Sequence, residues 1–384
     1  MRRLKVVDSH ACGPLRGPWS RAVRSNARVD ADMAARALPR PAASVVLGGL
    51  SVLVAASLLF GAAFGAVHLR ADDLLRMTLN HVLGARFEPT WRPQDEAIFF
   101  AIRLPRVAGA AVVGAALASA GVLFQGLLRN PLADPYALGV SGGAALGGAL
   151  GFLMSLSFSF LGFSPVPILA FGGALVAMSL VYTLARVGGR APIVTLLLAG
   201  FAVSAIMGYA VSFLLILNDR LQLNLPRVYG WLLGGISVTQ WSQLTLAVAM
   251  VALAIVGGWL MRHSLDALSL GEESAQQLGI SVENDKRLII LFGSVLTGAA
   301  VALGGLIGFV GLFAPHVTRI VVGPRHSLLL PAAALVGAAF LVLADLLARA
   351  ILPPTEIPVG ILTAFVGGPF FLWLLRRERR EYRV

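Results

Sequence analysis

Two arginines three positions apart are the first residues in this chain whose spacing suggests chemistry. They form the segment Arg103-Leu104-Pro105-Arg106, directly before a long apolar run. Guanidinium groups at a helix entrance can extend to lipid phosphates. They can equally form an exposed cationic patch whose paired hydrogen bonds hold the carboxylates of an acidic partner. The spacing by itself leaves both interpretations open.

A second polar segment, Gln125 to Ser141, interrupts the apolar sequence with two prolines, an asparagine and an aspartate. These residue types predict that a helix is broken here before a glycine-rich span begins. Asp134, directly before Pro135, is suited to cap the following helix. The segment is either a plain connector or the lining of a central pathway, where it would form a constriction.

The third segment, Arg262 to Arg287, is the longest polar interval between apolar runs. We read it as two short helices separated by turns at Gly271 and Gly279. Its apolar positions are Leu268, Leu270, Leu278 and Ile280. A solvated loop needs no leucines at such positions, so we favour docking into a groove of a soluble partner.

The chain lacks the residues of an energy-converting or catalytic site. No GxxxxGK[ST] phosphate loop occurs, and neither of its two lysines, Lys5 and Lys286, follows a glycine. There is no HExxH, no nucleophile–base–acid set and no cluster with metal-ligand spacing. The single cysteine, Cys12, excludes an intrachain disulfide. We therefore predict a transport subunit without cofactor or metal that takes its energy from another subunit, and not an enzyme.

The composition requires a membrane. Of 384 residues, 57% are apolar and 13% charged, and the mean hydropathy is +0.81. Soluble domains are about 45–50% apolar and about 25% charged. Apolar runs of about 20 residues are typical of spanning helices, not of barrel strands. A soluble enzyme, a disordered chain and an outer-membrane barrel are excluded, and we predict an all-α polytopic membrane protein.

Ten spans are expected. They lie at about 44–67, 104–127, 136–156, 166–187, 192–216, 242–261, 288–309, 309–323, 329–349 and 356–375. The eighth is short and contains Pro315, so we read it as a partial crossing. GxxxG spacings at Gly143/Gly147/Gly151 and Gly304/Gly308 predict close helix packing. Among ionisable residues within the spans, Asp345 is the main one, and we favour a local ion pair with Arg349 four positions later over a proton relay.

Charge indicates the orientation. The net charge is +12, and the first 40 residues hold eight Arg and one Lys against three Asp. The last nine residues hold five Arg against two Glu. Basic ends beside apolar spans predict cytoplasmic termini, with residues 1–43 as a disordered basic tail and 379–384 as a basic C-terminus. No basic stripe interleaves with aromatic residues, so no nucleic-acid partner is expected.

Six segments carry a resemblance to a known family. In chain order they are RLPR (103–106), GAALASAGVLFQGLLRNPLADPYALGVSGGAALG (114–147), LLLAG (196–200), LSLGEESAQQLGI (268–280), GGLIGFVGLFAPHVTRI (304–320) and EIPVGILTAFVGGPFFLWLL (356–375). Together they resemble FecCD-type permease subunits, which serve ABC importers for iron chelates, haem and cobalamin. The resemblance covers residues 44–378.

This resemblance implies a type II ABC importer permease in the bacterial inner membrane. Such a permease is a homodimer with one path at the interface, two ATP-hydrolysing subunits on the cytoplasmic side and a periplasmic substrate-binding protein opposite. The implied docking residues are Arg103, Arg106 and Arg349. The implied cytoplasmic gate consists of Asn130, Leu132, Ile193 and Val194. The implied ATPase-coupling residues, within 262–287, are Leu268, Gly271, Glu272, Ala275, Leu278 and Gly279.

Two points distinguish this chain within the resemblance. Cobalamin permeases carry small hydroxyl residues at the second gate, whereas Ile193 and Val194 are apolar; an apolar constriction can close by dewetting. Haem and ferric siderophores are often anionic and would suit the basic external residues. We favour an iron-bearing chelate as cargo, with cobalamin as the alternative. A secondary transporter would need intramembrane carboxylates and inverted repeats, and the sequence shows neither clearly.

Overall fold

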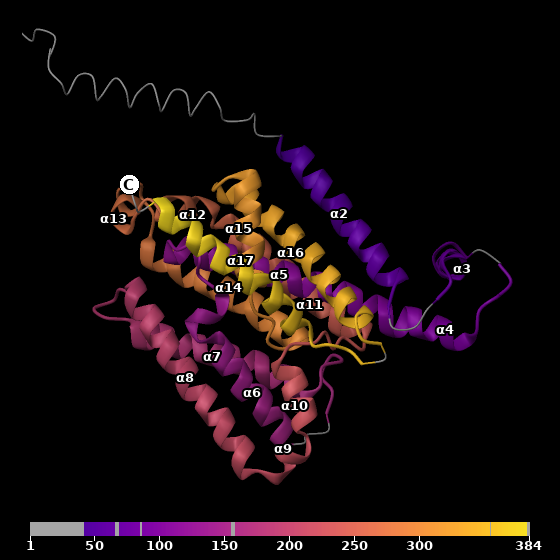
Figure 1. Ribbon diagram of the computed structural model, residues 1–384. Helices are drawn as coiled ribbons and strands as arrows, with labels where there is room; N and C mark the ends of the chain where they lie inside the picture. The colour runs from indigo at the N-terminus through magenta and orange to yellow at the C-terminus, as the bar shows by residue number, and fades with distance from the viewer. Residues whose placement is uncertain (1–41, 66–68, 85–86, 155–157, 354, 382–384) are drawn as a thin grey trace, which may run out of the picture. The chain divides into compact units, whose positions relative to one another are not determined.

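Helix α5 (Leu104–Leu128) is the element that makes most of the packing contacts, touching α2, α11, α12, α14, α15 and α16 (Figure 1). The computed structural model describes residues 42–65, 69–84, 87–154, 158–353 and 355–381. The predicted N-terminal tail, residues 1–43, lies almost wholly outside these ranges. From Ala43 onward the chain forms one unit, and every regular element among the described residues is a helix.

Among the residues that the structure describes, ten apolar helices match the ten predicted spans. Seven are long and apolar enough to cross a membrane: α2 (Ala43–Ala63), α4 through α5 (Pro93–Leu128), α7 (Pro165–Ala185), α8 (Ile193–Leu217), α11 (Trp241–Leu260), α14 (Val282–Gly304) and α16 (His326–Ala350). Three are shorter: α6 (Val140–Met154), α15 (Val310–Val322) and α17 (Val359–Glu381), the last apolar as far as Leu374. The all-α polytopic fold is confirmed.

Several short helices lie between the spans. They are α3 (Ala71–Leu83), a 3-10 helix (Pro135–Leu138), α9 (Asp219–Leu223), α10 (Leu225–Leu232), α12 (Arg262–Ser269) and α13 (Glu272–Gln277), while α4 (Pro93–Ala97) begins the second span. Helices α12 and α13 confirm the two short helices expected in 262–287. Helices α9 and α10 were not predicted, although Asn218 caps α9 through the amides of Arg220 and Leu221. That capping residue was the available signal.

The second span begins earlier than the sequence suggested. A π-helix, Ile98–Arg103, joins α4 to α5, and the Leu104 amide donates to the carbonyl of Phe99. Pro105 has no amide hydrogen, and its ring would clash with the carbonyl four residues back in a regular α-helix. The wider π turns directly before it relieve that clash. Arg103 and Arg106 therefore lie within one continuous helical segment and not at its entrance.

Glycines set the closest helix approaches. Gly143, Gly147 and Gly151 on α6 face α7, where a Cβ at Gly143 would meet the carbonyl of Gly173 and one at Gly147 would meet the carbonyl of Leu169. The predicted α6 GxxxG spacing is thus a packing face. The Gly304/Gly308 prediction is wrong, because α14 ends at Gly304 and nothing lies within 4 Å of a Cβ at Gly308.

Burial divides the spans into two kinds. Nineteen of the 25 residues of α5 are buried, whereas in α8, of equal length, only Leu196, Gly200, Val203 and Val211 are. Helix α8 contacts α6, α7, α9 and the 3-10 helix and lies at the margin of the bundle (Figure 1). Its exposed apolar side chains form a long face that the described residues leave uncovered. The core therefore surrounds α5, and α8 lies at its margin.

Candidate functional site

Two arginines cap the end of α2. We call the end of the bundle at which α2 and α16 finish and α5 begins the arginine end. Arg103 Nη1 donates to the carbonyls of Ala62 (3.1 Å) and Ala63 (3.2 Å). Arg349 Nη2 donates to the carbonyl of Gly61 at 3.3 Å. The last carbonyls of a helix have no partner within it and carry partial negative charge, so guanidinium groups stabilise this terminus.

Asp345, on α16, links Arg349 of the same helix to Arg106 of α5. Its Oδ2 accepts a hydrogen bond from Arg349 Nε at 2.9 Å, and its Oδ1 accepts one from Arg106 Nε at 3.0 Å. Arg106 Nη1 also donates to Glu356 at 2.7 Å. The Asp345 side chain is completely buried. The predicted i,i+4 pair between Asp345 and Arg349 is confirmed, and it is part of a larger network.

The arginines are less accessible than an exposed cationic patch would be. Arg103 is 4% exposed and Arg349 is 5% exposed, because both point into the bundle towards α2. Arg106 is also largely buried, at 16% exposure of its side chain, but it lines an open cavity. The docking role of the three residues stays a prediction. Arg106 is the most accessible of the three to a docking protein.

The cavity beside Arg106 has a volume of about 730 Å³ and a mixed lining. Arg227 from α10 and Glu356 contribute charge, and Gln240 and Gln243 contribute amides. The Trp231 ring meets Phe152 edge to face, with centroids 6.5 Å apart. Cations beside aromatic faces are suited to a flat or apolar molecule that bears carboxylates.

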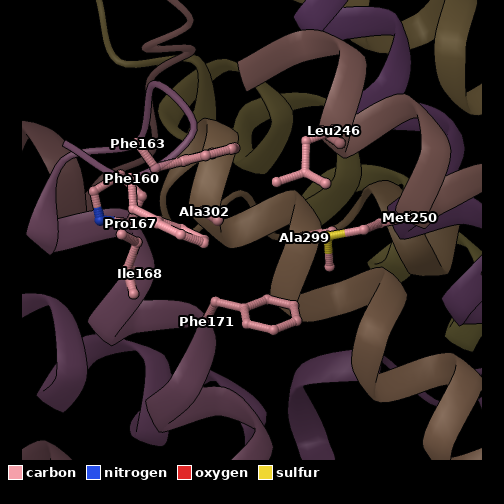
Figure 2. Close-up of a pocket in the computed structure, with 10 residues that line it drawn as sticks. Phe160, Phe163, Pro167, Ile168, Phe171, Leu246, Met250, Ala299 and Ala302 are labelled. Carbon is pink, nitrogen blue, oxygen red and sulfur yellow. The ribbon is translucent and has the colours of Figure 1, made fainter. Parts of the chain in front are cut away.

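A second cavity is wholly apolar. It measures about 200 Å³ and lies between the segment before α7, α7 itself, α11 and α14. Figure 2 shows Leu246 and Met250 facing Phe160 and Phe163 across it, with Phe171 to one side. Binding pockets fix a ligand's orientation with a few polar groups. This one offers none, so we assign it no solute.

The opposite end of the bundle, where α5 finishes and α12 and α13 lie, is called the short-helix end. There Asn130 Oδ1 accepts a hydrogen bond from the Leu132 amide at 2.9 Å, which closes a turn after α5. Asp134 accepts from the Tyr136 amide at 2.8 Å and caps the 3-10 helix, as predicted. Gln125 Nε2 donates to the carbonyl of Gly311 at 3.2 Å. The segment from Gln125 to Ser141 is therefore a folded connector.

The predicted gate residues lie on exposed or partly exposed positions at this end. Asn130 is exposed and Leu132 is half-buried. Ile193 is the first residue of α8, and Val194 after it is 68% exposed. No described contact joins the two pairs within one chain. Their role as a gate stays a prediction that requires a second copy of the chain.

The predicted coupling residues separate into two groups. Leu268 and Ala275 are buried at 2% and 0% exposure, so they support the short helices from beneath. Leu270 and Leu278 are 68% and 63% exposed and form the outward apolar face. Gly271 adopts φ 110° between α12 and α13, and Gly279 adopts φ 83°. Such backbone conformations favour glycine.

An ionic cluster that the sequence did not reveal joins these helices to α8. Lys286 Nζ, on α14, donates to Glu272 at 2.8 Å, to Glu283 at 3.0 Å and to the carbonyl of Ala191 at 3.1 Å. Lys286 is 1% exposed. Its spacing from Glu283 was the available signal, but the partner before α8 lies 95 positions away. Within the described ranges, no group of three His, Cys, Asp or Glu side chains could hold a metal ion.

Known proteins share this architecture. Residues 52–377 match the model of the FecCD transport family. The hemin transport system permease protein HmuU of Yersinia pestis is 40% identical over 88% of this chain and 97% of its own length. The cobalamin import system permease protein BtuC of Halobacterium salinarum is 45% identical over 74% of this chain and 75% of its own. A solved structure of a metal-chelate type ABC transporter, in an inward-facing conformation, is also similar. It has a TM-score of 0.73 and 30% sequence identity, and the match covers 86% of this chain and 99% of that one.

Proposed function

This chain belongs to the FecCD transport family and is a membrane permease of the ABC importer class, and we propose that it imports an iron-bearing chelate. Haem and ferric siderophores are the cargo classes we favour, and cobalamin is the alternative. The cavity at the arginine end carries this proposal, because Arg106 and Arg227 line it beside the ring of Trp231. Carboxylates of an anionic chelate would meet Arg227 there and would compete with Glu356 for Arg106. The apolar face of the chelate would meet the indole.

The proposed assembly follows from the exposed faces. A second copy of the chain would cover the apolar face of α8, which the described residues leave exposed. A periplasmic substrate-binding protein would dock on the arginine end, and two ATP-hydrolysing subunits on Leu270 and Leu278 at the short-helix end. The arginine end would then face the periplasm, and both termini would lie in the cytoplasm of a cell with the importer in its inner membrane.

The mechanism uses ATP that the chain itself does not hydrolyse. Closure of the ATPases on ATP binding would displace α12 and α13, and the spans would rearrange around α5. Because the cavity is large, with a volume of about 730 Å³, a bulky solute released into it would be held weakly. Weak binding lets the solute leave inwards.

Uptake by the reconstituted importer tests the proposal. We expect the chain, in liposomes with its ATPase and binding protein, to accumulate one iron-bearing chelate only when ATP is present. Haem, a ferric siderophore and cobalamin are compared side by side, each with and without ATP. Uptake of cobalamin alone would select the alternative cargo. Uptake driven by a proton or sodium gradient without the partners would refute the importer.

The Arg106–Glu356 pair gives a test of docking. We expect Arg106→Gln to weaken association with the cargo-free binding protein about tenfold, because a partly buried cation is lost from the face. We expect Glu356→Gln to strengthen it by about threefold, since an exposed carboxylate competes for Arg106 with a modest energy. Association is measured by biolayer interferometry on permease in nanodiscs. Asp72→Asn, which removes an exposed carboxylate on α3 that pairs with Arg70, is the matched control, and equal affinity of all variants would refute docking at Arg106.

A further inference from the structure

Lys286 is the centre of a fully satisfied ionic cluster at the short-helix end. A lysine ammonium has three N–H donors and no acceptor. In this structure the three acceptors come from three elements: Glu272 on α13, Glu283 on α14 and the carbonyl of Ala191 before α8. With 1% exposure, the ammonium is shielded from water. A buried cation held by two carboxylates resists separation because each broken contact would leave a charge unpaired.

Both backbone polar groups of Ala191 are hydrogen-bonded to side chains of the cluster. Its carbonyl accepts from Lys286, and its amide donates to Glu283 Oε2 at 3.2 Å. Only Pro192 separates it from the first residue of α8, and Pro192 is the N-cap of that helix with φ −63°. The proline ring fixes this dihedral. A displacement of Ala191 therefore moves the start of α8 as well, because the backbone between them has little freedom to absorb the movement.

Helices α12 and α13 both pack against α14, but their polar contacts reach different elements. On α12, Asp266 accepts from the His326 amide at 3.1 Å and contacts His326 Nδ1 at 2.6 Å, which ties this helix to the start of α16. On α13, Glu272 is tied through Lys286 to α14 and α8. Gly271 lies between them with φ 110°. The glycine allows α13 to turn relative to α12 at a position where other residues are strained.

We propose that Lys286 is a positioning residue that transmits displacement of α13 to the start of α8, and so to Ile193 and Val194. The inference rests on the proposed function, in which α13 contacts the ATPase and α8 borders the path. Helix α8 suits this role because so little of it is buried in its own chain. Its other described contacts are packing against α6, α7, α9 and the 3-10 helix, and packed helices can slide past one another by small shear movements. The attachment at Ala191 is made by hydrogen bonds to charged side chains.

The coupling ratio of the whole importer tests this link. Permease, ATPase and binding protein are reconstituted together, and cargo accumulated per ATP hydrolysed is measured for Glu272→Gln. This variant removes the carboxylate charge of α13, so the ion pair with Lys286 is lost and only a neutral amide oxygen can accept from the ammonium. Lys286 keeps its contacts with Glu283 and Ala191. We expect the ratio to fall about fivefold or more, because ATP is still hydrolysed while α8 no longer follows α13. Lys286→Met, which removes all three contacts, should lower it at least as far.

The adjacent residue supplies the matched control. Glu273, also on α13, is exposed, and we expect Glu273→Gln to keep the wild-type ratio. Hydrogen exchange at residues 190–200 gives a second measurement. ATPase binding should change exchange there in the wild type and in Glu273→Gln, but not in Glu272→Gln.

Two results would overturn the inference, and they are distinguishable. A wild-type ratio and a wild-type exchange response in Glu272→Gln would exclude the link while the importer remains intact. If Leu278→Glu, which places a charge on the outward face of the short helices, left ATPase binding unchanged, the proposed coupling surface itself would fail, and the link with it.

Discussion

Asp345→Ala is expected to abolish accumulation of folded permease. The Asp345 carboxylate is completely buried and holds both Arg106 and Arg349. Its removal takes away the carboxylate that contacts the Arg349 guanidinium at 2.9 Å. Breaking a buried ion pair by removing one partner costs about 3–5 kcal/mol. Domains are stable by only about 5–15 kcal/mol in total, so one substitution removes a large part of the stability.

The loss would extend to α2. Arg349 also donates to the carbonyls at the end of that helix, and Asp345 fixes the direction of its guanidinium. We expect the melting temperature of the detergent-purified protein, followed by size-exclusion fluorescence, to fall sharply or the folded peak to disappear. The melting temperature of Asp345→Asn should lie between those of the wild type and Asp345→Ala, because asparagine keeps the shape of the side chain but not its charge.

Glu356→Gln is the control for Asp345→Ala. It also removes a carboxylate from Arg106, but its side chain is 45% exposed, and exposed pairs contribute about 0–1 kcal/mol. The melting temperature should barely change. If Asp345→Ala were as stable as Glu356→Gln, the network would not support the arginine end.

Gly114→Ala is expected to separate α5 from α16 and to destabilise the core. A Cβ at Gly114 would overlap the carbonyl of Gly337 on α16, and a Cβ at Gly337 would overlap the carbonyl of Gly114. Both obstacles are backbone atoms, which cannot turn away as a side chain would. Overpacking in a core costs about 1–3 kcal/mol even where side chains can adjust, so we expect a cost at the top of that range or above. The melting temperature and the folded fraction after extraction measure it.

Gly172→Ala on α7 is the control for this substitution. Nothing lies within 4 Å of a Cβ at Gly172, and alanine is the better helix former. We expect unchanged or slightly raised stability. Equal stability of Gly114→Ala and Gly172→Ala would contradict backbone contact between α5 and α16.

Sequence reasoning also had a limit at the arginines. The arginines of RLPR were expected at the entrance of a long helix, and they lie within a continuous helical segment. Two functions compete for the same residue type. Exposed docking and burial against a helix terminus both need a guanidinium. Nothing in the local sequence selects between them, because the α2 carbonyls that decide it lie 41 positions before Arg103 and 288 before Arg349.

The sequence alone determined the features that depend on residues close together along the chain. Twenty apolar residues in a row indicate a membrane-spanning helix, since a helix satisfies all backbone hydrogen bonds within one segment, whereas barrel strands are about half as long. The α6 glycine spacing, the Asp345–Arg349 pair and the two short helices also follow from residues at most a few positions apart. All of these are present in the structure.

Only the tertiary structure decided how the polar residues are used. Lys286 meets Ala191 across 95 positions, and Arg106 meets Asp345 across 239. The energy of such a contact depends on burial and on which carbonyl or carboxylate lies opposite, and neither leaves a periodic trace in the sequence. Apolar patterning therefore fixes which segments cross the membrane, while folding alone brings together the charges that cap α2 and hold the start of α8.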